Sequence, residues 1–277
     1  MSAGLLGFES VHDRQGGVAS YVSPSRLNCW LSCPLKWKFT YIDGLRAPTT
    51  SSLFLGRIVH SALEAFYRNR QLGVTLTSED IAQRIVQSWG AAVDEDNMLF
   101  DNVAEEQALQ RQAAGLVSAY IQQMPADEPR PLAVDVAVEA PLIDPATGEN
   151  LGLPLVGVMD LVLDEPTGPL VCDFKTSSKS GSPLETAHET QLTSYALLFR
   201  HSHGQEEGGI EIRSLVKTKT PKVEFHRYPA RSDRHFRRLF AVIREYLDAV
   251  DSGRFNYRPG FACGMCDHRE RCRNWAG

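Results

Sequence analysis

The segment at residues 157–176 decides the fold, and it reads GVMDLVLDEPTGPLVCDFKT. Two apolar runs rich in Val and Leu flank the turn residues DEPTG at 164–168, a pattern that predicts two strands joined as a hairpin. If the hairpin folds symmetrically about its Pro-Thr turn, Asp160 lies directly opposite Asp173. Opposed residues on paired strands share a face, with Cβ atoms about 5 Å apart. The sequence therefore predicts two converging carboxylates.

A lysine follows closely on these carboxylates. Side chains alternate along a strand, so Asp173 and Lys175 share a face, whereas Cys172 and Phe174 point the other way, into the core. Two carboxylates beside a lysine fit a site for a hard divalent cation such as Mg²⁺ or Mn²⁺, which takes oxygen ligands. The alternative is a solvated hairpin with chance charges, because a short D-x-K pattern alone is weak evidence. The opposed Asp160 favours the metal site.

The rest of the chain predicts an α/β protein. A first helix is expected after the Ser23-Pro24 cap signal, running through Cys29 and Cys33 toward Trp37. Periodicity predicts further helices at 54–71, 78–95, 103–123, 186–202 and 231–250, and strands around 134–138 and at 153–163, 169–176, 209–218 and 222–228. This order predicts a mixed central sheet flanked by helices. We expect a flexible segment at 1–20, a helical region at 21–130, a core at 131–250 and a tail at 251–277.

Composition restricts the function classes. A chain of 277 residues allows one large domain or two modest ones. A net charge of −5 argues against a protein that coats DNA passively, but an enzyme with a local basic strip remains possible. No signal peptide or long apolar run is visible, so a cytoplasmic location is expected. Six cysteines in such a chain indicate metal binding rather than disulfides.

The two strand motifs identify a family. G-V-M-D at 157–160 followed by V-C-D-F-K-T at 171–176 resembles the active-site core of PD-(D/E)XK nucleases, and within them the RecB-like branch that includes AddB and CRISPR-associated exonucleases. The resemblance implies a restriction-endonuclease-like core and metal-assisted phosphodiester hydrolysis. It implies that Asp160 and Asp173, with the Phe174 carbonyl, bind Mg²⁺ or Mn²⁺. Lys175 would orient the attacking water or stabilise the charge on the phosphate.

An upstream helix extends the resemblance. Residues 56–64 read GRIVHSALE, similar to the branch's G-x-x-x-H-x-x-L-E helix. Gly56, His60 and Glu64 are four residues apart and therefore line one helix face. The resemblance implies that His60 is a metal ligand and Glu64 a supporting carboxylate. A lone helical histidine is more often an ordinary surface or core residue, but the carboxylates downstream reverse that preference.

Several residues are candidates for contact with DNA. E-T-Q-L-T-S-Y at 189–195 resembles the branch's Q-x-x-x-Y motif, which implies that Gln191 and Tyr195 hold the strand near the cleaved phosphate. Basic residues that could follow a phosphate backbone occur in two groups, Lys217, Lys219 and Lys222, and Arg231, Arg234, Arg237 and Arg238. Trp37 or Tyr41 could stack on unpaired bases. A charged solvent-facing surface is an equal alternative for each basic group.

The tail has a metal-binding spacing. Cys263 and Cys266 form C-x-x-C, and Cys272 follows after five residues. Four thiolates suit zinc or an iron–sulfur cluster, so a fourth ligand has to come from Cys29 or Cys33. Spacing alone does not separate the two metals, and His268 is a further possible ligand for Zn²⁺.

The resemblance favours one of these arrangements. C-P-L-K-W-K-F from Cys33 is similar to the branch's N-terminal cysteine segment, which implies a [4Fe–4S] cluster held by Cys33, Cys263, Cys266 and Cys272. Such a cluster would join the tail to the N-terminal helix. Its loss would destabilise the fold, because metal ligation adds to folding free energy.

These observations predict a DNA exonuclease acting on single-stranded DNA or DNA ends in recombination, repair or processing. The expected partners are DNA and a helicase, recombinase or CRISPR integrase. One alternative is a catalytically weak or inactive DNA-binding subunit for such a partner. Another is a zinc-stapled structural protein with an accidental D-x-K match. The joint presence of His60, Asp160, Asp173 and Lys175 favours activity.

Overall fold

The computed structural model describes residues 20–182 and 185–277. The segment expected to be flexible, 1–20, thus lies outside the described residues except for Ser20. The helices are α1 (Pro24–Ser32), α2 (Pro34–Trp37), a π-helix at Lys38–Ile42, α3 (Ser51–Gln71), α4 (Ser78–Asp96), α5 (Val103–Gln123), α6 (Glu185–His203), α7 (Asp233–Asp251), a 3₁₀-helix at Phe261–Met265 and α8 (Arg269–Arg273). The strands are β1 (Pro131–Ile143), β2 (Asn150–Leu163), β3 (Leu170–Ser177), β4 (Gly209–Val216) and β5 (Lys222–Tyr228).

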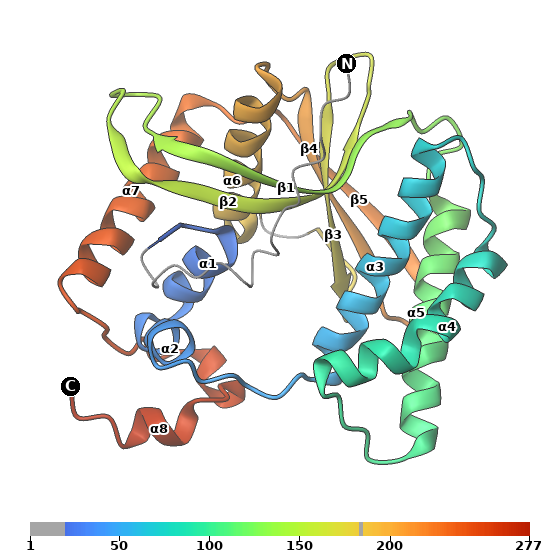
Figure 1. The fold of residues 1–277 in the computed structure, drawn as a ribbon, viewed down its shortest axis with the longest axis horizontal. Helices are drawn as coiled ribbons and strands as arrows, with labels where there is room; N and C mark the ends of the chain where they lie inside the picture. Colours follow the sequence, from blue (N-terminus) through green and yellow to red (C-terminus); the bar gives the residue numbers. More distant parts are fainter. Residues whose placement is uncertain (1–19, 183–184) are drawn as a thin grey trace.

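The strands form one mixed sheet in the order β1-β2-β3-β4-β5. β3 and β4 pair in parallel, and the other neighbouring pairs are antiparallel. In Figure 1, α3, α4 and α5 lie on one side of the sheet and α1, α6 and α7 on the other. The prediction of a mixed sheet flanked by helices is confirmed.

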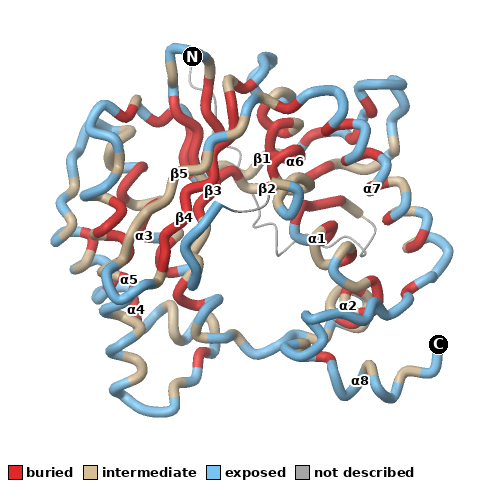
Figure 2. Tube along the Cα trace, turned by 180° about the vertical axis from the view of Figure 1, so that it is seen from behind, coloured by how far each residue is buried: buried red, intermediate tan, exposed pale blue. Residues whose placement is uncertain are grey.

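Each face of the sheet contributes to its own core. On β3, Leu170, Cys172 and Phe174 pack with α3, α4 and α5, whereas Val171 belongs to the opposite cluster. The predicted alternation therefore holds along this strand. Every residue of β4 is buried, as expected of a strand with helices on both faces, and Figure 2 shows this buried centre.

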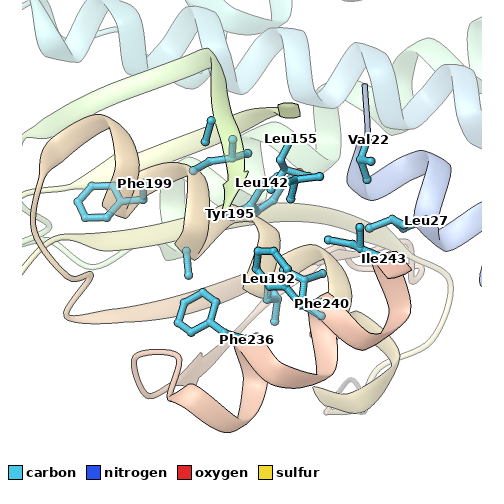
Figure 3. Close-up of a cluster of buried hydrophobic side chains, with 14 of the residues drawn as sticks. Val22, Leu27, Leu142, Leu155, Leu192, Tyr195, Phe199, Phe236, Phe240 and Ile243 are labelled. Atoms are coloured by element: carbon cyan, nitrogen blue, oxygen red, sulfur yellow. The ribbon is translucent and has the colours of Figure 1, made fainter. Parts of the chain in front are cut away.

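A hydrophobic core between α6, α7 and the sheet holds α6 in place. Leu192, Tyr195 and Phe199 of α6 pack with Phe236 and Phe240 of α7 (Figure 3). These α6 positions recur at intervals of three and four, which places them on one helix face. α6 is therefore held firmly over this face of the sheet.

The prediction of one continuous N-terminal helix through Cys33 is wrong. The helix begins as expected, since the Ser23 hydroxyl accepts a hydrogen bond from the Arg26 N–H at 3.3 Å. It ends at Ser32, and Cys33 is extended, with φ −166° and ψ 113°. The cause is Pro34, because a proline disfavours the helical conformation in the residue before it. A new short helix then starts at Pro34.

The C-terminal tail packs against this second helix. The Leu35 N–H donates to the Asn256 carbonyl at 3.2 Å, and Thr40 Oγ1 lies 3.3 Å from His268 Nε2. Trp37 is fully buried and stacks on Phe255 at a ring distance of 5.7 Å. The expectation that Trp37 stacks on bases is therefore wrong. In the described part of the chain, no helix is long and apolar enough to cross a membrane.

Candidate active site

The β2–β3 hairpin brings the two predicted carboxylates together. Its register pairs Leu161 with Cys172 and Leu163 with Leu170, and one more step places Asp160 opposite Asp173. This is the register that symmetric folding about the turn predicts. Asp160 Oδ2 accepts a hydrogen bond from the Phe174 N–H at 2.8 Å.

Asp173 is the most buried carboxylate of the site. Its Oδ1 accepts hydrogen bonds from Lys175 Nζ at 2.8 Å and Gln191 Nε2 at 3.1 Å. Its Oδ2 lies 2.6 Å from the same ammonium but forms no hydrogen bond of good geometry with any described residue. Burial raises the pKa of Asp173 to about 6 against the opposing charge of Lys175, and the nearby Asp160 carboxylate acts in the same direction as burial.

His60 approaches from α3. Its Nδ1 lies 3.4 Å from Asp160 Oδ1, and its ring meets Phe174 edge-on at 6.0 Å. Burial lowers the pKa of His60, but the hydrogen bond and charge of Asp160 outweigh it, so that the net shift is upward. The reverse holds for Asp160. Burial raises its pKa, but His60 and the Phe174 N–H bring it below its usual value.

Glu64 lies one helical turn beyond His60. Its Oε1 accepts a hydrogen bond from Arg68 Nε at 2.6 Å, and Arg68 also donates from Nη2 to the Asp135 carbonyl at 3.4 Å. Arg68 thereby ties α3 to the first strand of the sheet. Glu64 is placed beside the metal candidates and balanced by this arginine.

Asp135 is a site residue that sequence reasoning missed. Its neighbours Val134 and Val136 pair with Leu161 and Met159, so Asp135 stands opposite Asp160. It has the unusual φ of +47°. Burial raises the pKa of Asp135, and Glu64 adds to this effect.

Three of these residues, His60, Glu64 and Asp135, line one groove. It follows the outward face of α3 from Ser52 through Gly56 and His60 to Glu64, and it also includes Asp135 and Thr176. At Gly56 a Cβ atom would lie 3.4 Å from Thr176 Oγ1, so this turn of α3 lies next to the end of β3.

The Q-x-x-x-Y helix closes the site from the other side. Gln191 Nε2 donates to Asp173 and also to Tyr195 Oη at 2.8 Å. His188, one turn earlier on α6, was not singled out in the sequence. Burial lowers the pKa of His188, and the charge of Lys175 adds to this effect. The spacing of three before Gln191 could have revealed it.

The structure separates the predicted DNA-binding residues. Lys217 Nζ donates to Ser52 Oγ at 2.9 Å, which places Lys217 beside the end of the groove where α3 begins. Lys219 is exposed in the turn that follows. Arg234 is exposed on α7, across the sheet from α3. Lys217 therefore lies beside the groove, in contact with its lining residue Ser52, whereas Arg234 lies on α7.

The predicted cysteine ligands lie around one pocket. Cys33, Cys263, Cys266 and Cys272 all line it, and burial together with the other three thiols raises the pKa of Cys272. Burial raises the pKa of Cys29 to about 11. Among the described residues, no group of three or more His, Cys, Asp or Glu side chains is arranged to hold a metal ion as it stands.

Donor chemistry nevertheless fits the implied metals. Four thiols that line one pocket are a donor set for zinc or iron–sulfur. At the hairpin, an imidazole and opposed carboxylates, one with the buried unpaired Oδ2 of Asp173, are a donor set for Mg²⁺ or Mn²⁺.

Comparison with known proteins agrees with this geometry. The family model described as the PD-(D/E)XK nuclease superfamily matches residues 21–273. A crystal structure of a candidate exonuclease from Eubacterium rectale aligns over 99% of this chain and 95% of its own chain, with 13% identity and a TM-score of 0.62. At this identity the likeness shows the fold alone. The structure of SSO0001 aligns over 81% of this chain and 100% of its own at 14% identity, but its TM-score of 0.39 supports no argument. No curated protein sequence matches the chain.

The fold is a mixed sheet between helices, and its β2–β3 hairpin carries Asp160 and the Asp-x-Lys residues Asp173 and Lys175. The chain belongs to the PD-(D/E)XK nuclease superfamily. Members of this superfamily generally use a divalent metal ion.

Proposed function

We propose that this chain is a metal-dependent DNA exonuclease of the RecB-like branch, acting on single-stranded DNA or DNA ends. The observation that carries the proposal is the hairpin register, which pairs Leu161 with Cys172 and, continued by one residue, sets Asp160 opposite Asp173. His60 lies 3.4 Å from Asp160, and Lys175 lies 2.6 Å from Asp173. A structural hairpin has no need of two opposed carboxylates, because their repulsion and the burial of Asp173 disfavour folding.

The proposed divalent-cation ligands are His60, Asp160, Asp173 and the carbonyl of Phe174. When bound, a divalent cation lowers the pKa of a water and offsets charge on the phosphate. Asp160 is already oriented by the Phe174 N–H, and Asp173 is fixed by two donors. The carboxylates are therefore pre-positioned by the protein itself.

Lys175 and Gln191 complete the proposed chemistry. Lys175 lies on the same face of the hairpin as both carboxylates, and its Nζ contacts Asp173. From there it could orient the attacking water or stabilise charge on the phosphate. Gln191 commits its Nε2 hydrogens to Asp173 and Tyr195. Its Oε1 is then the atom left to accept a hydrogen bond from a water or a nucleotide.

The second part of the proposal concerns the cysteines. We propose that Cys33, Cys263, Cys266 and Cys272 hold a [4Fe–4S] cluster, with Zn²⁺ as the alternative. The support is that four thiols from the two ends of the chain line one pocket. Cys33 has an extended backbone between α1 and α2 and lines this pocket.

The test is cleavage of end-labelled single-stranded DNA with Mn²⁺ or EDTA. Wild type is compared with Lys175→Ala, and Lys179→Ala, an exposed lysine on the following loop, serves as the matched control. We expect metal-dependent degradation by wild type and Lys179→Ala and its loss in Lys175→Ala. If wild type binds single-stranded, duplex and flapped DNA but cuts none of them, the chain is instead a DNA-binding subunit for a helicase, recombinase or integrase.

A further inference from the structure

One large apolar side chain is exposed inside the groove. Leu53 is 64% exposed in the first turn of α3, whereas its neighbours Phe54 and Leu55 are buried in the core. It lines the same groove as His60 and Glu64. An isolated exposed leucine needs no explanation by itself. What distinguishes Leu53 is that it shares this groove with His60, a proposed metal ligand.

Leu53 is aligned with the metal candidates along the helix. It precedes His60 by seven residues, which is two helical turns and about 10 Å along the axis, and such residues lie on one stripe. The residue between them in the stripe, Arg57, is paired with Asp96 and Glu95 of α4. The charge of Arg57 is thus directed toward α4, and the apolar surface of Leu53 stays in the groove.

A lysine accompanies this leucine. Lys217 Nζ is hydrogen-bonded to Ser52 Oγ, next to Leu53 in the chain. The start of α3 adds the positive end of a helix dipole. The opposite end of the groove has the carboxylates Glu64 and Asp135. One end of the groove therefore has the apolar Leu53 with Lys217 beside it, and the other end is acidic.

We infer that Leu53 and Lys217 form the subsite for the nucleotide next to the scissile phosphate, in which Leu53 packs on the base and Lys217 pairs with the phosphate. This inference rests on the proposed function. A base in a duplex is stacked on its neighbours, so its face is open to a side chain only in an unpaired strand. The subsite therefore selects single-stranded nucleic acid.

The test is the rate of the first cleavage of short labelled single strands under single-turnover conditions. Leu53→Ala is compared with Leu72→Ala, since Leu72 is 80% exposed at the other end of α3. We expect Leu53→Ala to raise the enzyme concentration for half-maximal rate about tenfold with the maximal rate unchanged, as for loss of one apolar contact. Leu72→Ala should match wild type. Leu53→Phe should also bind as tightly as wild type, because it keeps a large apolar side chain at this position.

A modified substrate makes the test specific to the base. When the nucleotide beside the scissile phosphate is abasic, wild type should show the same loss and Leu53→Ala no further loss. Equal behaviour of Leu53→Ala and Leu72→Ala on both substrates overturns the subsite. If wild type does not cleave, the proposed function fails separately. The subsite is then decided by fluorescence anisotropy with the same strands, where equal affinities of the two variants overturn it and a base-dependent loss in Leu53→Ala supports it.

Discussion

Asp160 and Asp173 lie opposite each other on one hairpin, yet the pKa values of their carboxyl groups shift in opposite directions. The pKa of Asp160 is lowered, because its contacts with His60 and the Phe174 N–H outweigh the effect of burial. The pKa of Asp173 is raised to about 6, because burial outweighs the effect of the Lys175 charge. One carboxylate is thus ready to act as an anion at neutral pH, and the other is held at an energetic cost to the fold.

This cost gives the first prediction. A carboxyl whose pKa is higher in the folded than in the unfolded chain binds protons more tightly when folded, so its contribution to stability falls as pH rises from about 4 to about 6 and stays lost above. In EDTA, Asp173→Asn should therefore gain on the order of 3 kcal/mol relative to wild type between pH 4 and 7.5. Urea unfolding of both proteins at the two pH values measures this. A stability difference that does not change with pH would contradict it.

Phosphate contacts give the second prediction. Lys217 lies beside the groove through Ser52, whereas Arg234 lies on α7. Lys217→Gln should weaken single-strand binding and reduce the slope of log affinity against log salt by about 0.7, the value for one released counterion. Arg234→Gln, the matched control, should change neither. Anisotropy titrations across a salt series check this, and a larger effect at Arg234 would move the strand to the α7 side of the sheet.

The cysteines give the third prediction. Cys33→Ser should lose the bound metal and unfold at a lower temperature, because ligation contributes to folding. Cys29→Ser should keep the metal, since Cys29 is not among the residues of the shared pocket. Elemental analysis distinguishes iron from zinc, and thermal unfolding measures the loss.

A core control separates ligation from packing. Cys172 is fully buried in the cluster under α3 to α5, so Cys172→Ser should lower stability without loss of metal. Retention of metal in Cys33→Ser together with its loss in Cys29→Ser would assign the fourth ligand to Cys29.

The hairpin could be predicted from sequence because its turn is short and the register runs without a shift from Leu163 and Leu170. The same counting fails on the neighbouring strand pair. Counted from the turn that joins Ile143 and Asn150, residue 133 would stand opposite Asp160, but an irregularity near Pro141 shifts the register by two. The shift brings Asp135 to that place, and no periodicity in the sequence reveals it.

Two other differences have distinct causes. The break at Cys33 was signalled by Pro34, although helical spacing continued across it. The position of Arg234 was not signalled, because a basic helix can pack on either face of a sheet. Motif residues close in sequence were thus predictable, whereas the path of DNA depends on long-range packing.

The parallel pairing of β3 and β4 has one more consequence. Two parallel neighbours cannot be joined by a tight turn, so the chain has to return along the sheet through a crossover. That crossover contains α6, and it brings Gln191 within hydrogen-bond distance of Asp173. The parallel pairing requires a crossover, and in this chain the crossover helix presents Gln191 to the second carboxylate. In this fold, the crossover connection between β3 and β4 places Gln191 at Asp173.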